Sequence, residues 1–255
     1  MSDGSVLYRL DGDVAVITLN EPESRNALSQ AIRSGLLAAL ERLDSDDRAK
    51  VGILTGAGDK AFCAGAHLGE MAGEALGVPP AGYVPIVGRG VDLDKLLIAA
   101  VNGAAHGGGL LLAQMADLAV AAEHATFAMP EARWSRGAPW SVPLSRMIPQ
   151  RVWLELLVTG DPIDARRAYE IGFVNRVVPA AELMPAAMAL ARRIAANAPL
   201  TVRASREMVQ VAGELGLTAA WDAADELFEP VYRSQDALEG PRAFRERREP
   251  RWEGR

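Results

Sequence analysis

Two short glycine-containing loops hold the residues of this 255-residue sequence that could stabilise a negative charge. Residues 107–109 are three successive glycines between a strand-like segment and an apolar helix, and the loop within 61–70 (AFCAGAHLGE) also follows a strand. The first N–H groups of a helix have no acceptor within the helix, and glycine lets a substrate atom approach them closely. One N–H group from each loop could therefore bind the same oxygen atom and form an oxyanion hole. Alternatively, both loops are tight turns that allow close strand–helix packing.

The other reactive residue types give no pattern that points to a metal or to nucleophilic catalysis. The three histidines are scattered without zinc-binding spacing, and the single cysteine, Cys63, cannot form an internal disulfide. Small apolar residues flank Cys63, which favours packing over reactivity. The glycines also lack the G-x-G-x-x-G spacing of a dinucleotide-binding loop. We therefore expect no metal site.

The composition indicates a globular protein of the reducing cytoplasm. Hydrophobic residues make up 49% of the chain, which is enough for a large core. The net charge of -6 argues against a nucleic acid or an anionic membrane as the main partner, because both attract clustered positive charge. No apolar run reaches the ~18 residues that a membrane-spanning helix needs, and early charges interrupt any signal-peptide pattern. We expect a cytoplasmic location, no nucleic acid and no membrane contact.

Alternating strand and helix patterns predict the α/β fold that must position the two loops. Residues 11–13 (Asp-Gly-Asp) separate two strand-like runs and predict a β-hairpin, since Asp-Gly fits a tight turn. Ser29 is an N-cap candidate for a helix whose apolar residues recur at helical spacing: Ile32, Leu36, Leu40 and Leu43. Strands are expected within 50–56, 96–103 and 117–123. Repeated strand–helix–strand units predict a mixed, largely parallel sheet system with helices outside it.

The sequence after residue 180 has a helical pattern. Helices are expected within 181–199, 200–213, 217–233 and 236–248. These helices have apolar faces that a small appendage could not bury alone. The faces include Trp221, Leu227, Phe228 and Val231. Upstream, residues 73–90 are the best candidate for a mobile connection because they combine glycine, proline and the bulky Tyr83.

Five segments resemble the crotonase, or enoyl-CoA hydratase/isomerase, superfamily in the family's order and over nearly the whole chain. They are EPESRNALS, AFCAGAHL, the stretch from AAVNGAAHGGG to MPEARW, the stretch from LLVTGDPID to NRVVP, and SQDALEGPRAFRERREPRWEGR. The resemblance implies an α/β, crotonase-like spiral of ββα units with a C-terminal helical trimerisation region. Residues 1–195 would form the core with the acyl-CoA site, and residues 196–255 the oligomerisation region. It also implies a homotrimer or a dimer of trimers. The implied substrates are acyl-CoA thioesters, in which CoA is part of the substrate, so no further cofactor is needed.

The resemblance assigns catalytic roles to residues of the two loops and of the next turn. The N–H groups of Ala66 and Gly108 would hold the thioester oxygen as it becomes an enolate. Hydratases of the family have two glutamates, one in the helix after the glycines and one in a later Pro-Glu turn. The second is present as Glu131, but Leu111 replaces the first.

Apolar and aromatic neighbours of Glu131 bear on its proton affinity. Phe127, Met129 and Trp134 flank it in sequence, so burial is expected to raise its pKa towards neutral pH. A single carboxylate resembles the Δ3,Δ2-enoyl-CoA isomerases, in which one base removes a proton from C2 and returns it at C4. Hydration usually needs two groups, so Leu111 makes an efficient hydratase doubtful. Without the motif around it, Glu131 would be an ordinary turn carboxylate.

The resemblance also points to substrate-binding residues. It places Arg25, Asn26, Ala27, Leu28 and Ala64 along the CoA path, Phe244 and Arg247 against CoA bound to a neighbouring subunit, and His67, Leu111 and Trp134 at the acyl group. For the basic C-terminal segment the alternative is a solvated helix face, and for His67 a surface imidazole. His106 is expected to be partly buried with a backbone partner, and Asp117 to be structural. The segment ARWSRGAPWSVP departs from the family's pattern and leaves the acyl group open.

Three hypotheses about the function therefore stay open. The first is an enzyme that isomerises, hydrates or dehydrates an acyl-CoA thioester with one glutamate. The second is a lyase that resembles the carnitinyl-CoA dehydratases, on the basis of the C-terminal segment. The third is a catalytically weak scaffold that only binds acyl-CoA. Glu131 favours an enzyme, and Leu111 keeps the scaffold open.

Overall fold

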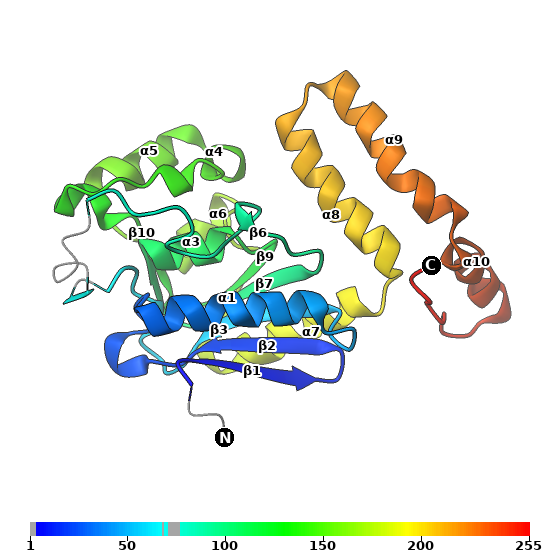
Figure 1. Ribbon diagram of the computed structural model, residues 1–255, viewed down its shortest axis with the longest axis horizontal. Helices are drawn as coiled ribbons and strands as arrows, with labels where there is room; N and C mark the ends of the chain where they lie inside the picture. Colours follow the sequence, from blue (N-terminus) through cyan, green and yellow to red (C-terminus); the bar gives the residue numbers. More distant parts are fainter. Residues whose placement is uncertain (1–3, 68, 71–76) are drawn as a thin grey trace. The chain divides into compact units, whose positions relative to one another are not determined.

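The computed structural model describes residues 4–67, 69–70 and 77–255. The chain divides into two compact units, residues 1–191 and 192–255, and all the described strands lie in the first (Figure 1). The division follows Ala191, slightly earlier than the expected boundary after residue 195. The roles expected for the two regions, substrate binding and oligomerisation, stay predictions.

A six-stranded sheet forms the first layer of unit 1. Its strands run in the order β1-β2-β3-β7-β9-β12, with β1 antiparallel to β2 and the other pairs parallel. The β1–β2 pair, in which Asp11 lies opposite Val14, is the predicted hairpin. The strands are β1 (Val6–Asp11), β2 (Val14–Leu19), β3 (Val51–Gly56), β7 (Leu96–Val101), β9 (Leu118–Ala122) and β12 (Arg176–Val178).

A second sheet contains four short strands, three of which directly follow a strand of the first sheet. Its order is β11-β10-β8-β4, and β4, β8 and β10 run parallel. The strands are β4 (Ala61–Cys63), β8 (Ala104–His106), β10 (Thr126–Ala128) and β11 (Ile163–Asp164). Thus β3 leads to β4, β7 to β8 and then to helix α3 (Gly108–Gln114), and β9 to β10. This repetition is the expected arrangement of ββα units, and it brings the two glycine loops to neighbouring strand ends.

Helices, 3-10 turns and a separate two-stranded sheet make up the other described elements of unit 1. Helix α1 (Gln30–Ser45) packs on β1 and β2, and the predicted N-cap, Ser29, accepts the N–H of Ile32 at 3.2 Å. The apolar residues predicted for this helix, Ile32, Leu36, Leu40 and Leu43, are all buried. The other elements are α4 (Leu144–Met147), α5 (Gln150–Thr159), α6 (Ala165–Glu170), the strands β5 (Ile86–Val87) and β6 (Gly90–Val91), and 3-10 turns at Pro22–Ser24, Pro130–Trp134, Pro139–Ser141 and Ala180–Glu182.

The connection expected at 73–90 is described only in part. Residues 73–76 lie outside the described residues. Within 77–90, Tyr83 accepts a hydrogen bond from Arg33 at 3.0 Å, and the guanidinium of Arg33 also lies 4.0 Å from the centre of the Tyr83 ring. This part of the connection is therefore attached to α1.

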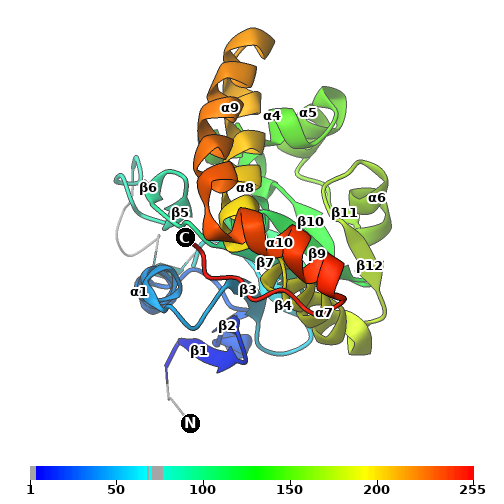
Figure 2. The ribbon, with the colours of Figure 1, turned by 90° about the vertical axis from the view of Figure 1, so that its right-hand side faces the viewer.

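Unit 2 is helical, as expected. Helix α7 (Leu183–Ala195) contains the division between the units, and α8 (Pro199–Glu214), α9 (Leu217–Arg233) and α10 (Gln235–Glu246) follow. Helices α8 and α9 lie side by side (Figures 1 and 2). Leu227 and Val231 help to line a groove between them. Trp221 on α9 is 68% exposed. A homotrimer that covers these residues stays a prediction.

The C-terminal residues fold back onto α10. The buried carboxylate of Asp236 accepts the N–H groups of Glu253 and Gly254 at 2.7 and 3.0 Å, and Glu239 binds the guanidinium of Arg248. None of the described helices is long and apolar enough to cross a membrane.

Candidate active site

The parallel pairing of β4 and β8 brings the two glycine loops into contact. A Cβ atom on Gly65 would lie 2.7 Å from the carbonyl oxygen of His106 and 3.3 Å from the nitrogen of Gly108. A Cβ atom on Gly109 would collide with the carbonyl oxygen of Cys63. The glycines are therefore required by close backbone approach, and this same approach places the two loops beside each other. Both sequence interpretations, close packing and an oxyanion hole, agree with this geometry.

The hydrogen bonds distinguish the glycines of the triplet. Gly107 has a φ of 53° and donates its N–H to the carbonyl of Ala128 at 2.9 Å. Gly108 is the first residue of α3, so its N–H has no acceptor within the helix. Within residues 4–67, 69–70 and 77–255, no acceptor is found for the N–H of either Ala66 or Gly108. These are the two donors that the resemblance predicts, and their role as an oxyanion hole stays a prediction.

Asn26 fixes the segment expected along the CoA path. Its side chain is fully buried, donates to the carbonyls of Ala57 and Ala61 at 3.0 and 2.9 Å, and accepts the N–H of Glu21 at 3.0 Å. Asn26 therefore has a structural role and is turned away from solvent. Both it and the exposed Arg25 have left-handed backbone conformations.

Two backbone hydrogen bonds join this segment to the loop after β4. The N–H of Ala64 donates to the carbonyl of Arg25 at 3.0 Å, and the N–H of Leu28 donates to the carbonyl of Gly65 at 2.8 Å. A Cβ atom on Gly108 would lie 2.5 Å from the methyl group Cδ1 of Leu28. Leu28 therefore packs directly against Gly108, the first residue of α3. Arg25, Ala27, Leu28 and Ala64 thus lie beside the predicted oxyanion donors, although their contact with CoA stays a prediction.

Glu131 lies in the 3-10 turn Pro130–Trp134, directly against the glycine triplet. A Cβ atom on Gly107 would lie 3.0 Å from Glu131 Oε1. Oε2 is buried, and none of the described residues gives it a hydrogen-bond partner. Burial raises the pKa of Glu131, partly opposed by a hydrogen bond from its own N–H. A buried carboxylate with a free oxygen and a raised pKa is suited to accept a proton and return it.

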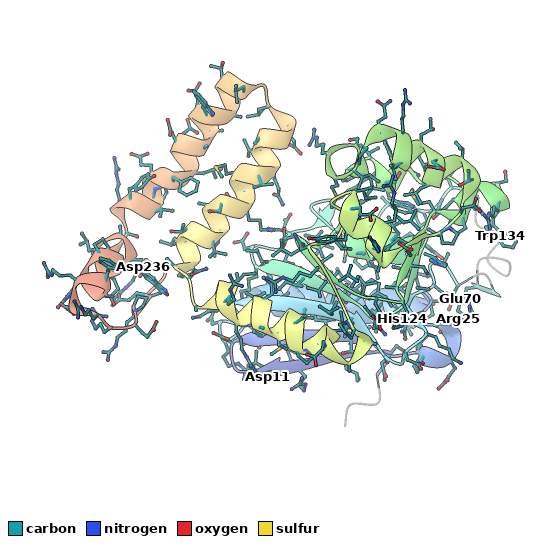
Figure 3. All side chains as sticks on the ribbon, turned by 180° about the vertical axis from the view of Figure 1, so that it is seen from behind. Asp11, Arg25, Glu70, His124, Trp134 and Asp236 are labelled. Atoms are coloured by element: carbon teal, nitrogen blue, oxygen red, sulfur yellow. The ribbon has the colours of Figure 1, made fainter. Side chains whose placement is uncertain are left out.

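The neighbours of Glu131 differ in part from the sequence expectation. Phe127 and Met129 are fully buried, as expected. Trp134 is 61% exposed, so the expectation that it helps to bury Glu131 is wrong. Its side chain points outwards on the side of unit 1 where Arg25 and Glu70 also lie (Figure 3). The predicted role of Trp134 at the acyl group stays a prediction.

The raised pKa of Glu131 predicts a pH dependence of activity. The folded protein keeps the proton at pH values where a carboxyl group with its ordinary pKa near 4.5 has lost it. Glu131, the predicted catalytic base, would accept a proton only in its ionised form, so we expect kcat/KM to fall as the pH decreases through its raised pKa. The same shift favours the folded state at low pH, an advantage lost as the pH rises from 4.5 through the raised pKa. The unfolding temperature measured against pH should lack this pH-dependent change in the Glu131→Gln variant. Identical pH profiles for the parent and the variant would contradict the assignment of the raised pKa to Glu131.

Leu111 lies one turn into α3, where its N–H donates to the carbonyl of Gly107 at 3.1 Å. It is 2% exposed, yet it lies outside the main hydrophobic core cluster, whereas Leu110, Leu112 and Ala113 belong to it. The buried side chain of Leu111 is therefore not one of those that form this core. That location agrees with the predicted position at the acyl group.

The other reactive side chains are held by local hydrogen bonds. His67 Nδ1 accepts the N–H of Glu70 at 3.2 Å. His106 is partly buried, but its Nε2 is paired with the Thr126 hydroxyl at 2.9 Å, so the expected backbone partner is wrong, and burial lowers its pKa. Cys63 is fully buried, and burial raises its pKa to about 12, which confirms a packing role.

The predicted structural role of Asp117 agrees with the hydrogen bonds. Its Oδ2 accepts the N–H of Leu97 at 2.8 Å. Phe244 and Arg247, by contrast, lie in unit 2 near the end of α10, where Phe244 is 86% exposed. Their contact with CoA on a neighbouring subunit stays a prediction. Among the described residues, no three histidine, cysteine or acidic side chains form a group that could hold a metal ion.

Comparisons with known proteins agree with the fold and with the sequence motifs. A family model described as enoyl-CoA hydratase/isomerase matches residues 9–255. The chain is 37% identical over 266 residues to a carnitinyl-CoA dehydratase of Salmonella paratyphi A, with 100% of both chains covered. The structure of an enoyl-CoA hydratase from Mycobacterium tuberculosis matches with a TM-score of 0.92 at 37% identity, covering 99% of this chain and 100% of that one.

A further solved structure belongs to the same group. It is a putative enoyl-CoA hydratase/isomerase from Mycobacterium abscessus, with a TM-score of 0.88 at 40% identity, covering 98% of this chain and 100% of that one. The fold is thus that of an α/β enzyme of the crotonase type. The chain belongs to the enoyl-CoA hydratase/isomerase family.

Proposed function

We propose that this enzyme moves a double bond within an acyl-CoA thioester, using Glu131 as its single proton carrier. The N–H groups of Ala66 and Gly108 hold the thioester oxygen while the enolate exists. Glu131 removes a proton from C2 and returns it at C4. CoA is part of the substrate, and the proposed reaction needs no metal and no other cofactor.

The observation that carries this proposal is the environment of Glu131. Its Oε2 is buried without a partner among the described residues, its Oε1 lies against Gly107, and burial raises its pKa. The position that would hold a second carboxylate has the apolar Leu111. One base that both takes and returns a proton suits migration of a double bond, whereas hydration usually needs a second group to position water.

A substrate panel tests the proposed reaction. The purified protein is incubated with 2-enoyl-CoA and 3-enoyl-CoA esters of several chain lengths, and hydration and double-bond migration are followed separately. We expect migration to exceed hydration. Binding of every ester without turnover would instead identify an acyl-CoA-binding scaffold.

Dehydration is the second candidate, because the identity to a carnitinyl-CoA dehydratase extends over the full length of both chains. In that reaction Glu131 would take the proton from C2, while the same N–H donors hold the enolate, and would then pass this proton to the hydroxyl group as it leaves C3 as water. Addition of a 3-hydroxyacyl-CoA ester to the panel separates the two reactions. The homotrimeric state and the cytoplasmic location remain predictions, and sedimentation at micromolar concentration tests the first.

Leu111→Glu is expected to increase hydration of a short 2-enoyl-CoA ester. The new carboxylate would lie one turn from Gly107, and two neighbouring carboxylates raise the pKa of one of them, which supplies one acid and one base near neutral pH. Because the site is buried, the variant should also be less stable. Leu111→Gln is the matched control, since it is polar and of similar size but transfers no proton. A folded Leu111→Glu protein that binds the ester without a gain over Leu111→Gln would contradict the prediction.

A further inference from the structure

Two buried side-chain atoms have no hydrogen-bond partner among the described residues, and both belong to elements around Leu111. They are Glu131 Oε2 and Gln114 Oε1. A buried polar oxygen that has lost its water without gaining a donor destabilises the fold, so each needs an explanation. The proposed proton transfer accounts for Glu131. Gln114, the last residue of α3 and only 6% exposed, has no role in that reaction.

The direction of the Gln114 amide is fixed by its other end. Nε2 donates to the carbonyl of Trp140 at 3.0 Å. The turn that contains Trp140 is itself held, because the Ser141 hydroxyl donates to Ala138 at 2.7 Å and accepts from the Trp153 ring nitrogen at 3.2 Å. A half-turn of the amide would place Oε1 against the Trp140 carbonyl, and two acceptors repel. The hydrogen bond to the Trp140 carbonyl therefore holds the amide in the orientation in which Oε1 has no hydrogen-bond donor among the described residues.

Gln114 follows Leu111 by three residues and Leu110 by four, so its side chain leaves α3 between these two. Leu110 belongs to the hydrophobic core cluster and Leu111 does not, so Gln114 lies between a core side chain and the side chain at the predicted acyl position. Gln114 lies one turn further along α3 from the Gly108 N–H than Leu111 does. An acyl chain that leaves the oxyanion donors and passes Leu111 would reach Gln114 beyond its reacting carbons.

We propose that Gln114 determines acyl specificity: its Oε1 accepts a hydrogen bond from a hydroxyl or N–H group on the acyl chain, beyond the carbons that react. The proposal rests on the acyl-CoA chemistry given above. A hydrogen-bond donor on the acyl chain would pair with Oε1 of Gln114, whereas a plain alkyl chain would leave this oxygen buried and unpaired. Sites that bind a substrate hydroxyl or N–H group by a hydrogen bond reject the analogue that lacks that group. The Trp140 turn belongs to the ARWSRGAPWSVP segment that departs from the family's pattern.

Matched pairs of esters test this proposal. The probes are 3-hexenoyl-CoA with 6-hydroxy-3-hexenoyl-CoA, and 3-octenoyl-CoA with 8-hydroxy-3-octenoyl-CoA. The measured quantity is the ratio of kcat/KM for the hydroxylated ester to that for the alkyl ester. We expect a ratio on the order of threefold to tenfold at one of the two chain lengths, the usual effect of one neutral hydrogen bond. In Gln114→Leu, the ratio should fall to one or below.

The control is Gln150→Leu, which makes the same substitution at an exposed residue and should keep the parent ratio. Equal ratios in the parent and in Gln114→Leu at both chain lengths would overturn the proposal and leave Gln114 with a trapped water molecule. Should Gln114→Leu fail to fold, Gln114→Met provides the same comparison. If none of the esters is turned over, the proposed reaction fails, and the ratio of dissociation constants for the same pairs, measured by calorimetry, still tests Gln114.

Discussion

Glu131→Gln is expected to lower turnover of an acyl-CoA ester by ~10²–10⁴, the usual contribution of a positioned acid–base group. The amide keeps the shape of the side chain but cannot accept the proton. Since Oε2 has no partner among the described residues, the substitution breaks no hydrogen bond at that atom, and the affinity for the ester should change little. Steady-state kinetics and calorimetric titration with the same ester measure the two quantities.

The matched control for this variant is Glu123→Gln, which changes an exposed glutamate in the same unit and should leave kcat unchanged. Activity of Glu131→Gln within a few-fold of the parent would show that the base is another residue. His67, in the loop of Ala66, would then be the next candidate. A large loss of affinity together with turnover would instead point to a binding role for Glu131.

Gly65→Ala is expected to reduce kcat by ~10²–10³, the effect of misplacing an oxyanion donor. The new Cβ would lie 2.7 Å from the His106 carbonyl, so the loops of Ala66 and Gly108 would have to separate. Gly65 also has a φ of 94°, and a side chain in this region costs about 1–3 kcal/mol of backbone strain.

Gly90→Ala separates these two effects. Gly90 has the same φ of 94°, but a Cβ atom there would meet nothing within 4 Å. This control should therefore show the loss of stability due to strain without the loss of kcat. Equal kcat values for Gly65→Ala and Gly90→Ala would indicate that the two loops do not hold the reacting oxygen.

Local sequence patterns predicted most of the fold. The Asp-Gly turn predicted the β1–β2 hairpin, the spacing of Ile32, Leu36, Leu40 and Leu43 predicted α1, and the helical pattern after residue 180 predicted α7 to α10. These signals depend on neighbours a few residues apart, so one sequence contains them. The small residues of the glycine triplet and of the loop of Gly65 likewise indicated two accessible backbone segments, but the contact between them depends on the pairing of β4 with β8.

Hydrogen bonds between distant residues were missed. Asn26 binds carbonyls more than thirty residues away, and His106 pairs with the Thr126 hydroxyl in the adjacent strand β10. The unpaired oxygen of Gln114 was equally hidden, because it depends on the carbonyl of Trp140 in a separate turn. Such partners depend on strand register and turn placement, which periodicity does not determine. An unusual polar residue within an apolar helix, as Gln114 is, was the available signal.

The hydrogen bond from Gly107 to Ala128 has a consequence for how this scaffold can change its chemistry. It joins the residue after β8 to the last residue of β10, and so connects the start of α3 to the turn that carries Glu131. Leu111 and Gln114 project from α3 without taking part in that join. If the proposed roles of Leu111 and Gln114 hold, we expect substitutions at these two positions to change the reaction and the accepted acyl group while this hydrogen bond is kept. This separation makes positions 111 and 114 the natural places to diversify a library of variants for new acyl-CoA reactions.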